Sequence, residues 1–140
     1  MKKETDNIRI GCWGIITNNK NQVLLLKRRK VDYWEEPGGK LKVGELLEKG
    51  VTREIYEETG INTKVADFLL FDEVFWGDSK QHWITFNYHL KHVSGEVKNM
   101  EPEKHEDVRW FSFSDLPKNI GWLTMKSINK YLEKNKQEEG

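Results

Sequence analysis

The 140-residue chain has a single cysteine, no net charge and no long apolar run. Cys12 by itself cannot form an intramolecular disulfide, and a cysteine-rich zinc site is excluded. With 23 basic and 23 acidic residues, the chain offers no broad attraction for nucleic acid or an anionic membrane. The first ten residues lack a signal-peptide core, and no stretch approaches the roughly 20 apolar residues that span a bilayer. We therefore expect a cytoplasmic protein without membrane or nucleic-acid partners.

The length and patterning predict one mixed α/β domain over residues 1–140. A hydrophobic content of 36% is sufficient for a core. Alternation of apolar and polar residues predicts strands, and apolar spacing of three and four predicts helices. The expected strands are 8–17, 23–28, one or two within 63–76, 82–93 and 108–113; the expected helices are 45–59 and 122–132, with a loop at 31–44 and a fraying polar tail.

Three carboxylates lie together on the expected helix at 45–59. Glu54, Glu57 and Glu58 are spaced i, i+3 and i+4, so they share one face. Like charges at this spacing repel by about a few tenths of a kcal/mol per pair. The face is either simply solvated or holds a cation, and oxygen ligands suit Mg²⁺ or Mn²⁺. Gly50 belongs to the same face and would leave room for a group that approaches the carboxylates.

The residues around these carboxylates match a specific pattern. It reads Gly, five residues, Glu, seven residues, Arg-Glu, an aliphatic residue, any residue, Glu-Glu, any residue, Gly and an aliphatic residue. Residues 39–61 fill every specified position, with Gly39, Glu45, Arg53, Glu54, Ile55, Glu57, Glu58, Gly60 and Ile61. This segment resembles the Nudix box. Trp34 and Pro37 before it, and WFSFSDLP near the C-terminus, extend the resemblance to the Nudix hydrolase family over about residues 8–132.

The resemblance implies an α/β/α sandwich with a mixed β-sheet, and hydrolysis of a phosphoanhydride with Mg²⁺ or Mn²⁺. Glu54 would be, or would orient, the base that activates water, and Arg53 and Glu45 would orient the catalytic helix. A further acidic ligand is expected from the loop that holds Glu101, Glu103 and Glu106, with Glu103 preferred. By position in the pattern, the metal ligands are the Gly38 carbonyl, Glu54, Glu57, Glu58 and Glu103.

The MutT-like branch of the family is the one that the chain resembles most. Trp76 stands where ADP-ribose hydrolases often have proline, and residues 72–87 contain no tyrosine of the kind found in dinucleoside polyphosphate hydrolases. This branch cleaves nucleoside triphosphates, ordinary or oxidised, to a monophosphate and pyrophosphate. The alternatives are hydrolysis of ADP-ribose or a nucleoside diphosphate sugar, and a nucleotide-binding module without turnover. We expect a small nucleotide as partner, and a monomer or homodimer.

Four residues are candidates for substrate binding. Arg28 would contact phosphate through its fork of N–H donors, with Lys27 and Arg29 as rivals. The candidates for stacking on the base are Trp34, Phe75, Trp76 and Trp83, and the alternative for each is packing in the core or on the surface. Glu36 replaces the apolar residue usual before Pro-Gly-Gly and would make a polar contact, while Asn119 would reach a base edge or lie in an exposed turn. The four histidines, His82, His89, His92 and His105, are read as surface or strand residues.

Overall fold

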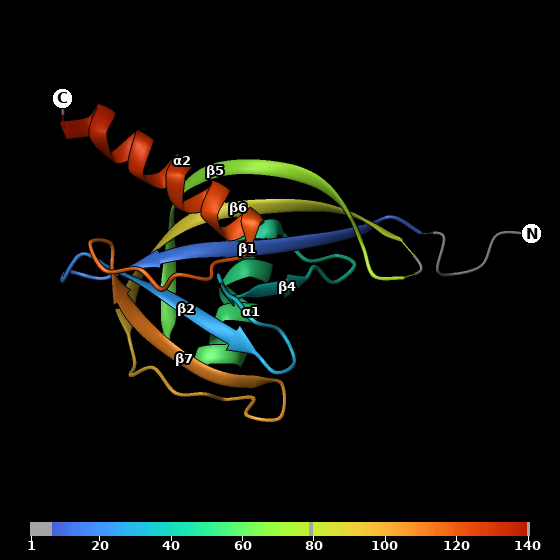
Figure 1. Cartoon of the computed structure of the whole chain (residues 1–140). Helices are drawn as coiled ribbons and strands as arrows, with labels where there is room; N and C mark the ends of the chain where they lie inside the picture. Colours follow the sequence, from blue (N-terminus) through green and yellow to red (C-terminus); the bar gives the residue numbers. More distant parts are fainter. Residues whose placement is uncertain (1–6, 79, 140) are drawn as a thin grey trace, which may run out of the picture.

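The structure is a computed structural model that describes residues 7–78 and 80–139. A mixed sheet of seven strands lies between two helices (Figure 1). Along the main path the strand order is β3-β2-β1-β6-β5, with β4 paired to β1 and β7 to β2. The elements are β1 (Arg9–Thr17), β2 (Gln22–Arg28), β3 (Trp34–Glu35), β4 (Gly38–Lys40), α1 (Leu47–Thr59), β5 (Asn62–Trp76), β6 (Gln81–Ser94), β7 (His105–Ser112) and α2 (Trp122–Glu139).

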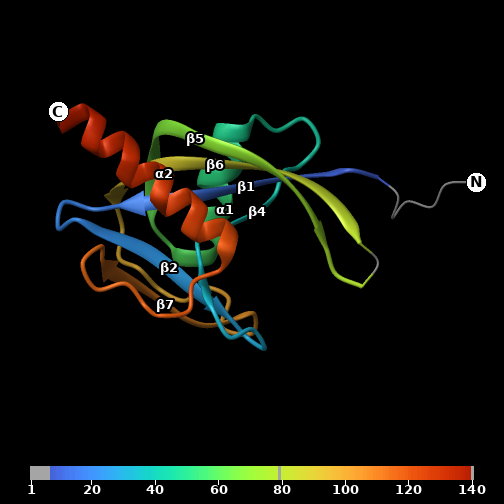
Figure 2. The same ribbon diagram turned by 45° about the horizontal axis from the view of Figure 1, so that its top comes forward.

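Alternation along the central strands builds a core on each face of the sheet. Cys12 and Ile16 of β1 pack in one buried cluster with Ile55 of α1. Ile15, between them, points the other way and packs with Ile128 of α2. Successive strand residues face opposite sides of a sheet, so one strand supplies both cores. The rotated view in Figure 2 shows α1 and α2 on opposite sides of the strands. The expected α/β/α sandwich with a mixed sheet is confirmed.

The centre of the sheet is the parallel pair β1 and β6, and the short strand β4 pairs with β1. β1 and β6 run parallel over Arg9–Thr17, whereas the other strand pairs are antiparallel. β4 adds to the early part of β1, opposite Gly11, Cys12 and Trp13. Residues 41–46 connect this short strand to α1. The pairing of β4 with β1 therefore anchors the chain shortly before the acidic helix begins.

Several expected boundaries differ from the structure. The segment expected to be a loop, 31–44, contains β3 and β4, because both pair with longer strands. The acidic helix begins at Leu47 rather than at Glu45. The segment within 63–76 is one strand with three register shifts. α2 continues to Glu139, seven residues beyond the expected end at Leu132, and residues 1–6 and 140 lie outside the described part.

The end of α1 has a backbone cause. Gly60 takes a left-handed conformation with φ of 76°, and its N–H donates to the Tyr56 carbonyl at 2.9 Å. Glycine adopts this conformation without the steric penalty of a side chain. The helix stop expected at Gly60 is therefore confirmed. Among the described residues, the helices are too short or too polar to cross a membrane.

Candidate active site

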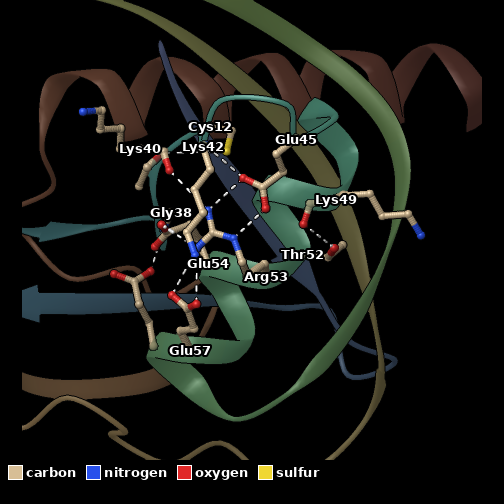
Figure 3. Close-up of polar contacts among 12 residues, drawn as sticks. Cys12, Gly38, Lys40, Lys42, Glu45, Lys49, Thr52, Arg53, Glu54 and Glu57 are labelled. Carbon is tan, nitrogen blue, oxygen red and sulfur yellow. Dashed lines mark hydrogen bonds and ion pairs between the residues drawn. The ribbon is translucent and has the colours of Figure 1, made fainter. Parts of the chain in front are cut away.

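Arg53 organises the carboxylates of α1 (Figure 3). Its Nε and Nη2 donate to the two Glu45 carboxylate oxygens at 2.6 and 2.9 Å. Its Nη1 reaches Glu54 at 3.0 Å and Glu57 at 3.1 Å, and Nη2 also donates to the Lys40 carbonyl at 3.3 Å. A planar guanidinium holds several acceptors in fixed directions. Arg53 therefore ties the helix to β4 and to the loop that precedes the helix.

Glu45 is held from two sides and stays ionised. Besides the Arg53 fork, it accepts a hydrogen bond from the Lys42 backbone N–H at 3.0 Å. These hydrogen bonds, the one from Arg53 above all, lower the pKa of the Glu45 carboxyl to about 2. The expected supporting roles of Arg53 and Glu45 stay predictions, and this geometry supports them.

Two glycines make room for the carboxylate network. A Cβ on Gly39 would lie 2.6 Å from Glu54 Oε2, so the Glu54 carboxylate occupies the space that a side chain at 39 would need. A Cβ on Gly50 would lie 2.6 Å from Leu41 Cδ1 and 3.0 Å from Glu45 Oε1. Gly50 therefore accommodates Leu41 and Glu45, which differs from the expected approach of a ligand to Glu54, Glu57 and Glu58.

The three expected metal-binding glutamates line one cavity of about 620 Å³, together with Gly38 and Glu103. Glu58 is buried and accepts a hydrogen bond from the Gly38 N–H at 2.7 Å. Burial raises the pKa of the Glu58 carboxyl well above its usual range, with the Gly38 N–H opposing and the Glu54 charge adding to it. Burial also raises the pKa of Glu54, against the opposing effect of Arg53.

Glu101 and His105 complete the acidic cavity from the other side. Ligand atoms of Glu58, Glu101 and His105 all lie within 4.8 Å of one another, and His105 Nε2 is 3.5 Å from Glu58 Oε2. The Met100 N–H donates to the Glu58 carbonyl at 3.2 Å, which fixes the loop before β7 against the end of α1. Glu103, the preferred extra ligand, lines the same cavity but is outside this group of three.

His105 was missed by the sequence analysis. It is 2% exposed at the start of β7 and lines the cavity, whereas it was read as an ordinary surface or strand residue. The strand was expected to begin at 108, and it begins three residues earlier because His105 pairs with Arg28 of β2. No local pattern in the sequence marks this pairing.

A second, wider cavity of about 950 Å³ adjoins the acidic one. Trp13, Trp76 and Trp83 line it, with ring centroids 5.4 to 6.1 Å apart in edge-on and tilted contacts. The start of α2 and the segment before it also line this cavity. Five residues line both cavities: Arg28, Gly38, Gly39, Glu58 and His105. We call the two spaces the aromatic cavity and the acidic cavity.

The expected substrate-binding residues are divided between the cavities and the core. Arg28 lies between the cavities, half exposed, with its Nε 2.5 Å from Glu35 Oε1. Trp34 packs edge-on against Phe111 in the core on the α2 side and lines neither cavity. Asn119 is exposed on the aromatic cavity, and its carbonyl accepts a hydrogen bond from the Trp34 N–H at 2.8 Å.

Glu36 lines the aromatic cavity and is 2% exposed. Its side chain lies under the start of α2, where its backbone N–H donates to Thr124 Oγ1 at 3.0 Å. Burial raises the pKa of the Glu36 carboxyl to about 8, partly opposed by the hydroxyls of Ser127 and Thr124. Neither carboxyl oxygen has a hydrogen-bond partner among the described residues.

The donor set of the acidic cavity fits a divalent cation. Carboxylates from α1 and from the loop before β7 meet there, and burial disfavours the ionised form of Glu54 and Glu58 unless a cation offsets the charge. Glu54, Glu57, Glu58 and Glu101 supply oxygen, which Mg²⁺ and Mn²⁺ prefer, and His105 supplies a nitrogen. The residues thus suit the metal that the resemblance implies, without fixing which one.

Comparisons with known proteins agree with this geometry. A model of the NUDIX domain matches residues 7–132. The crystal structure of a MutT NUDIX hydrolase from Burkholderia pseudomallei is similar, with a TM-score of 0.80 and 32% identity, over 89% of this chain and 98% of that one. The ADP-ribose pyrophosphatase of Methanocaldococcus jannaschii is 34% identical over 122 residues, which are 85% of this chain and 70% of the relative.

A shorter match concerns a protein of Bacillus subtilis (strain 168) that is provisionally named as an 8-oxo-dGTP diphosphatase. It is 43% identical over 56 residues, which are 40% of this chain and 38% of that protein. The match thus spans well under half of the length of this relative. The names of these two relatives refer to different substrates, 8-oxo-dGTP and ADP-ribose.

Proposed function

This chain belongs to the NUDIX domain family, and on that premise we propose that it hydrolyses a nucleoside triphosphate, ordinary or oxidised, to a monophosphate and pyrophosphate. The observation that supports this most is the junction of the two cavities, which share Gly38, Gly39 and Glu58. A ligand across this junction places its phosphates among the carboxylates and its flat organic group beside the tryptophans. Pockets of this size suit ligands of nucleotide size.

The residues divide the chemical work in this proposal. Glu54, Glu57, Glu58 and Glu101 would hold Mg²⁺ or Mn²⁺, together with the Gly38 carbonyl and with Glu103 as the alternative acid. When bound, the cation supplies charge neutralisation for the phosphate oxygens. Glu54 accepts a proton from the attacking water or orients that water, and Arg53 keeps its carboxylate in place at 3.0 Å. Arg28, at the boundary of the cavities, contacts a phosphate oxygen.

A second candidate function is hydrolysis of a nucleoside diphosphate linked to another group. The similarity to the ADP-ribose pyrophosphatase of Methanocaldococcus jannaschii, over 85% of this chain, favours it. The same acidic cavity would serve both reactions, since both break a phosphoanhydride. The products separate them, because a triphosphate gives pyrophosphate and a diphosphate-linked compound gives two monophosphates.

The test is a turnover screen with Mg²⁺ and with Mn²⁺. Ordinary and oxidised nucleoside triphosphates are compared with ADP-ribose, sugar nucleotides and dinucleoside polyphosphates, and the products are identified. The matched control is Glu57→Gln, because this side chain is 46% exposed and its change leaves the core intact. We expect pyrophosphate and one monophosphate from a triphosphate, and at least a hundredfold lower turnover in the variant at an unchanged Tm.

Two results would overturn the proposal. Turnover of diphosphate-linked compounds alone would move the assignment to the second candidate. Nucleotide binding without any turnover would identify a binding module. Turnover of triphosphates that persists in Glu57→Gln would refute the assignment of this carboxylate to the metal site.

A further inference from the structure

Glu36 carries a buried carboxyl group that the protein leaves without a partner. Both of its oxygens are inaccessible to water and have no hydrogen-bond partner among the described residues. The Ser127 and Thr124 hydroxyls are near enough to oppose the rise of its pKa, but neither is within hydrogen-bond geometry of a Glu36 oxygen, and Ser127 donates its proton to the Leu123 carbonyl at 3.2 Å. An unpaired buried polar group costs free energy, so folded proteins rarely retain one without a use. The carboxyl lies where a bound molecule would provide the missing partner.

The surroundings of Glu36 are suited to a flat ring. The aromatic cavity that it lines is also lined by Trp13, Trp76 and Trp83 and by the start of α2. Such rings provide stacking surfaces for a heterocycle. The cavity joins the acidic cavity at Gly38, two residues after Glu36, so a nucleotide with its phosphates there brings its base towards this carboxyl.

The residues that line the aromatic cavity near Glu36 favour a base that carries a hydrogen-bond donor. Arg28, a cation in the same lining, is already paired with Glu35 at 2.5 Å. A carboxyl group has acceptor oxygens in either protonation state, and an exocyclic amino group offers two N–H donors. A base with a carbonyl group in place of the amino group presents an acceptor at that position, which an acceptor oxygen of the carboxyl group cannot pair with. A pocket that hydrogen-bonds an N–H rejects the analogue that lacks it, because its buried polar group is left unpaired.

We propose that Glu36 is the specificity-determining residue of the aromatic cavity, and that it selects nucleotides whose base carries an exocyclic amino group. Adenine, cytosine and guanine belong to this class, and hypoxanthine and uracil do not. The inference rests on the proposed function in that a nucleotide is taken as the occupant. It does not require the nucleotide to be hydrolysed.

The experiment measures binding of nucleoside monophosphates, which are not hydrolysed, by tryptophan fluorescence and calorimetry in the presence of Mg²⁺. The amino and oxo members are compared in the pairs AMP and IMP, GMP and IMP, and CMP and UMP. The wild-type protein should bind the amino member of at least one pair about tenfold more tightly or better. In Glu36→Met, of similar length and without polar oxygens, this ratio should fall to about one.

Glu35→Met is the matched control. Glu35 is the adjacent carboxylate in the same lining, but it is paired with Arg28. Its loss should weaken binding of both members of a pair and leave their ratio unchanged. Melting temperatures report folding: Glu36→Met should melt no lower than the wild type, since an unpaired buried carboxyl is replaced by an apolar side chain.

Three results would overturn the inference. They are equal binding of the members of every pair by the wild type, no binding of any monophosphate, and a ratio that survives in Glu36→Met. Failure of the proposed function is distinct from these. If the protein prefers amino bases but does not hydrolyse triphosphates, the role of Glu36 stands and the proposed function fails. If it hydrolyses triphosphates at the same rate whatever the base, the proposed function stands and the role of Glu36 fails.

Discussion

Replacement of Gly39 by alanine is a direct probe of the position of Glu54. The new Cβ would lie 2.6 Å from Glu54 Oε2, 2.7 Å from Cδ and 3.0 Å from Oε1. Gly39 does not have the positive φ found at Gly38 and Gly44, so alanine fits the backbone at this position. The change therefore displaces the carboxylate without straining the main chain.

The expected displacement follows from these distances. Ordinary contact begins near 3.4 Å, so the closest Glu54 atom must move by about 0.8 Å. A misplacement of about 1 Å at a reacting group lowers turnover by roughly a hundredfold. Stability should not fall, because alanine restricts the unfolded chain and contributes about 0.4–1 kcal/mol at a compatible site. We expect a loss of about a hundredfold in kcat/KM at an unchanged or slightly higher Tm.

A double-mutant cycle tests whether the effect passes through Glu54. The rates of the wild type, Gly39→Ala, Glu54→Ala and the double variant are measured with saturating Mg²⁺ on the best nucleotide substrate. In the Glu54→Ala protein the added Cβ has no carboxylate to meet, so Gly39→Ala should change the rate by less than about threefold. An equal loss in both backgrounds, or no loss in the wild-type background, would refute the reasoning.

Two further predictions concern the support of the site and the stability of the fold. Arg53→Lys should lower kcat/KM by about 10–100-fold, since one ammonium cannot replace the fork on Glu45 and the contacts to Glu54; steady-state rates within threefold of the wild type would contradict this. Burial lowers the pKa of His89 to about 4. As the pH falls, the unfolded chain therefore binds a proton at His89 before the folded protein does. The stability that neutral His89 provides is present above pH 6.5 and is lost as the pH falls towards 4. Urea unfolding should show wild-type stability falling more steeply over this range than that of His89→Gln, by about 1 kcal/mol after allowance for solvent screening; parallel slopes would contradict it.

Local chemistry in the sequence was sufficient to predict the acidic helix and its stop. The spacing of Glu54, Glu57 and Glu58 sets a shared helix face, and Gly60 ends the helix because its left-handed conformation suits glycine. The central strands were predicted from the alternation of residue types, because successive residues of a strand face the two opposite sides of the sheet. These features depend on neighbours within about one helical turn or along one strand.

Contacts between distant segments were decided by the tertiary structure alone. β3 and β4 form in the expected loop because β2 and β1 offer them pairing partners. His105 lies beside Glu58 because β7 pairs with β2 and its preceding loop is bonded to the end of α1. Trp34, one of four candidates for stacking on the base, packs against the core on the α2 side, beside Phe111.

The sequence by itself determined that Glu54, Glu57 and Glu58 share one face of a helix, because helical periodicity places them without reference to the rest of the chain. Only the tertiary structure decided what surrounds them. Gly39 leaves room for Glu54, Glu101 joins Glu58, and Glu36 is buried in the lining of the aromatic cavity without a hydrogen-bond partner among the described residues. The physical reason is that a cavity is formed by side chains from separate elements, and strand pairing and helix packing alone bring those elements together.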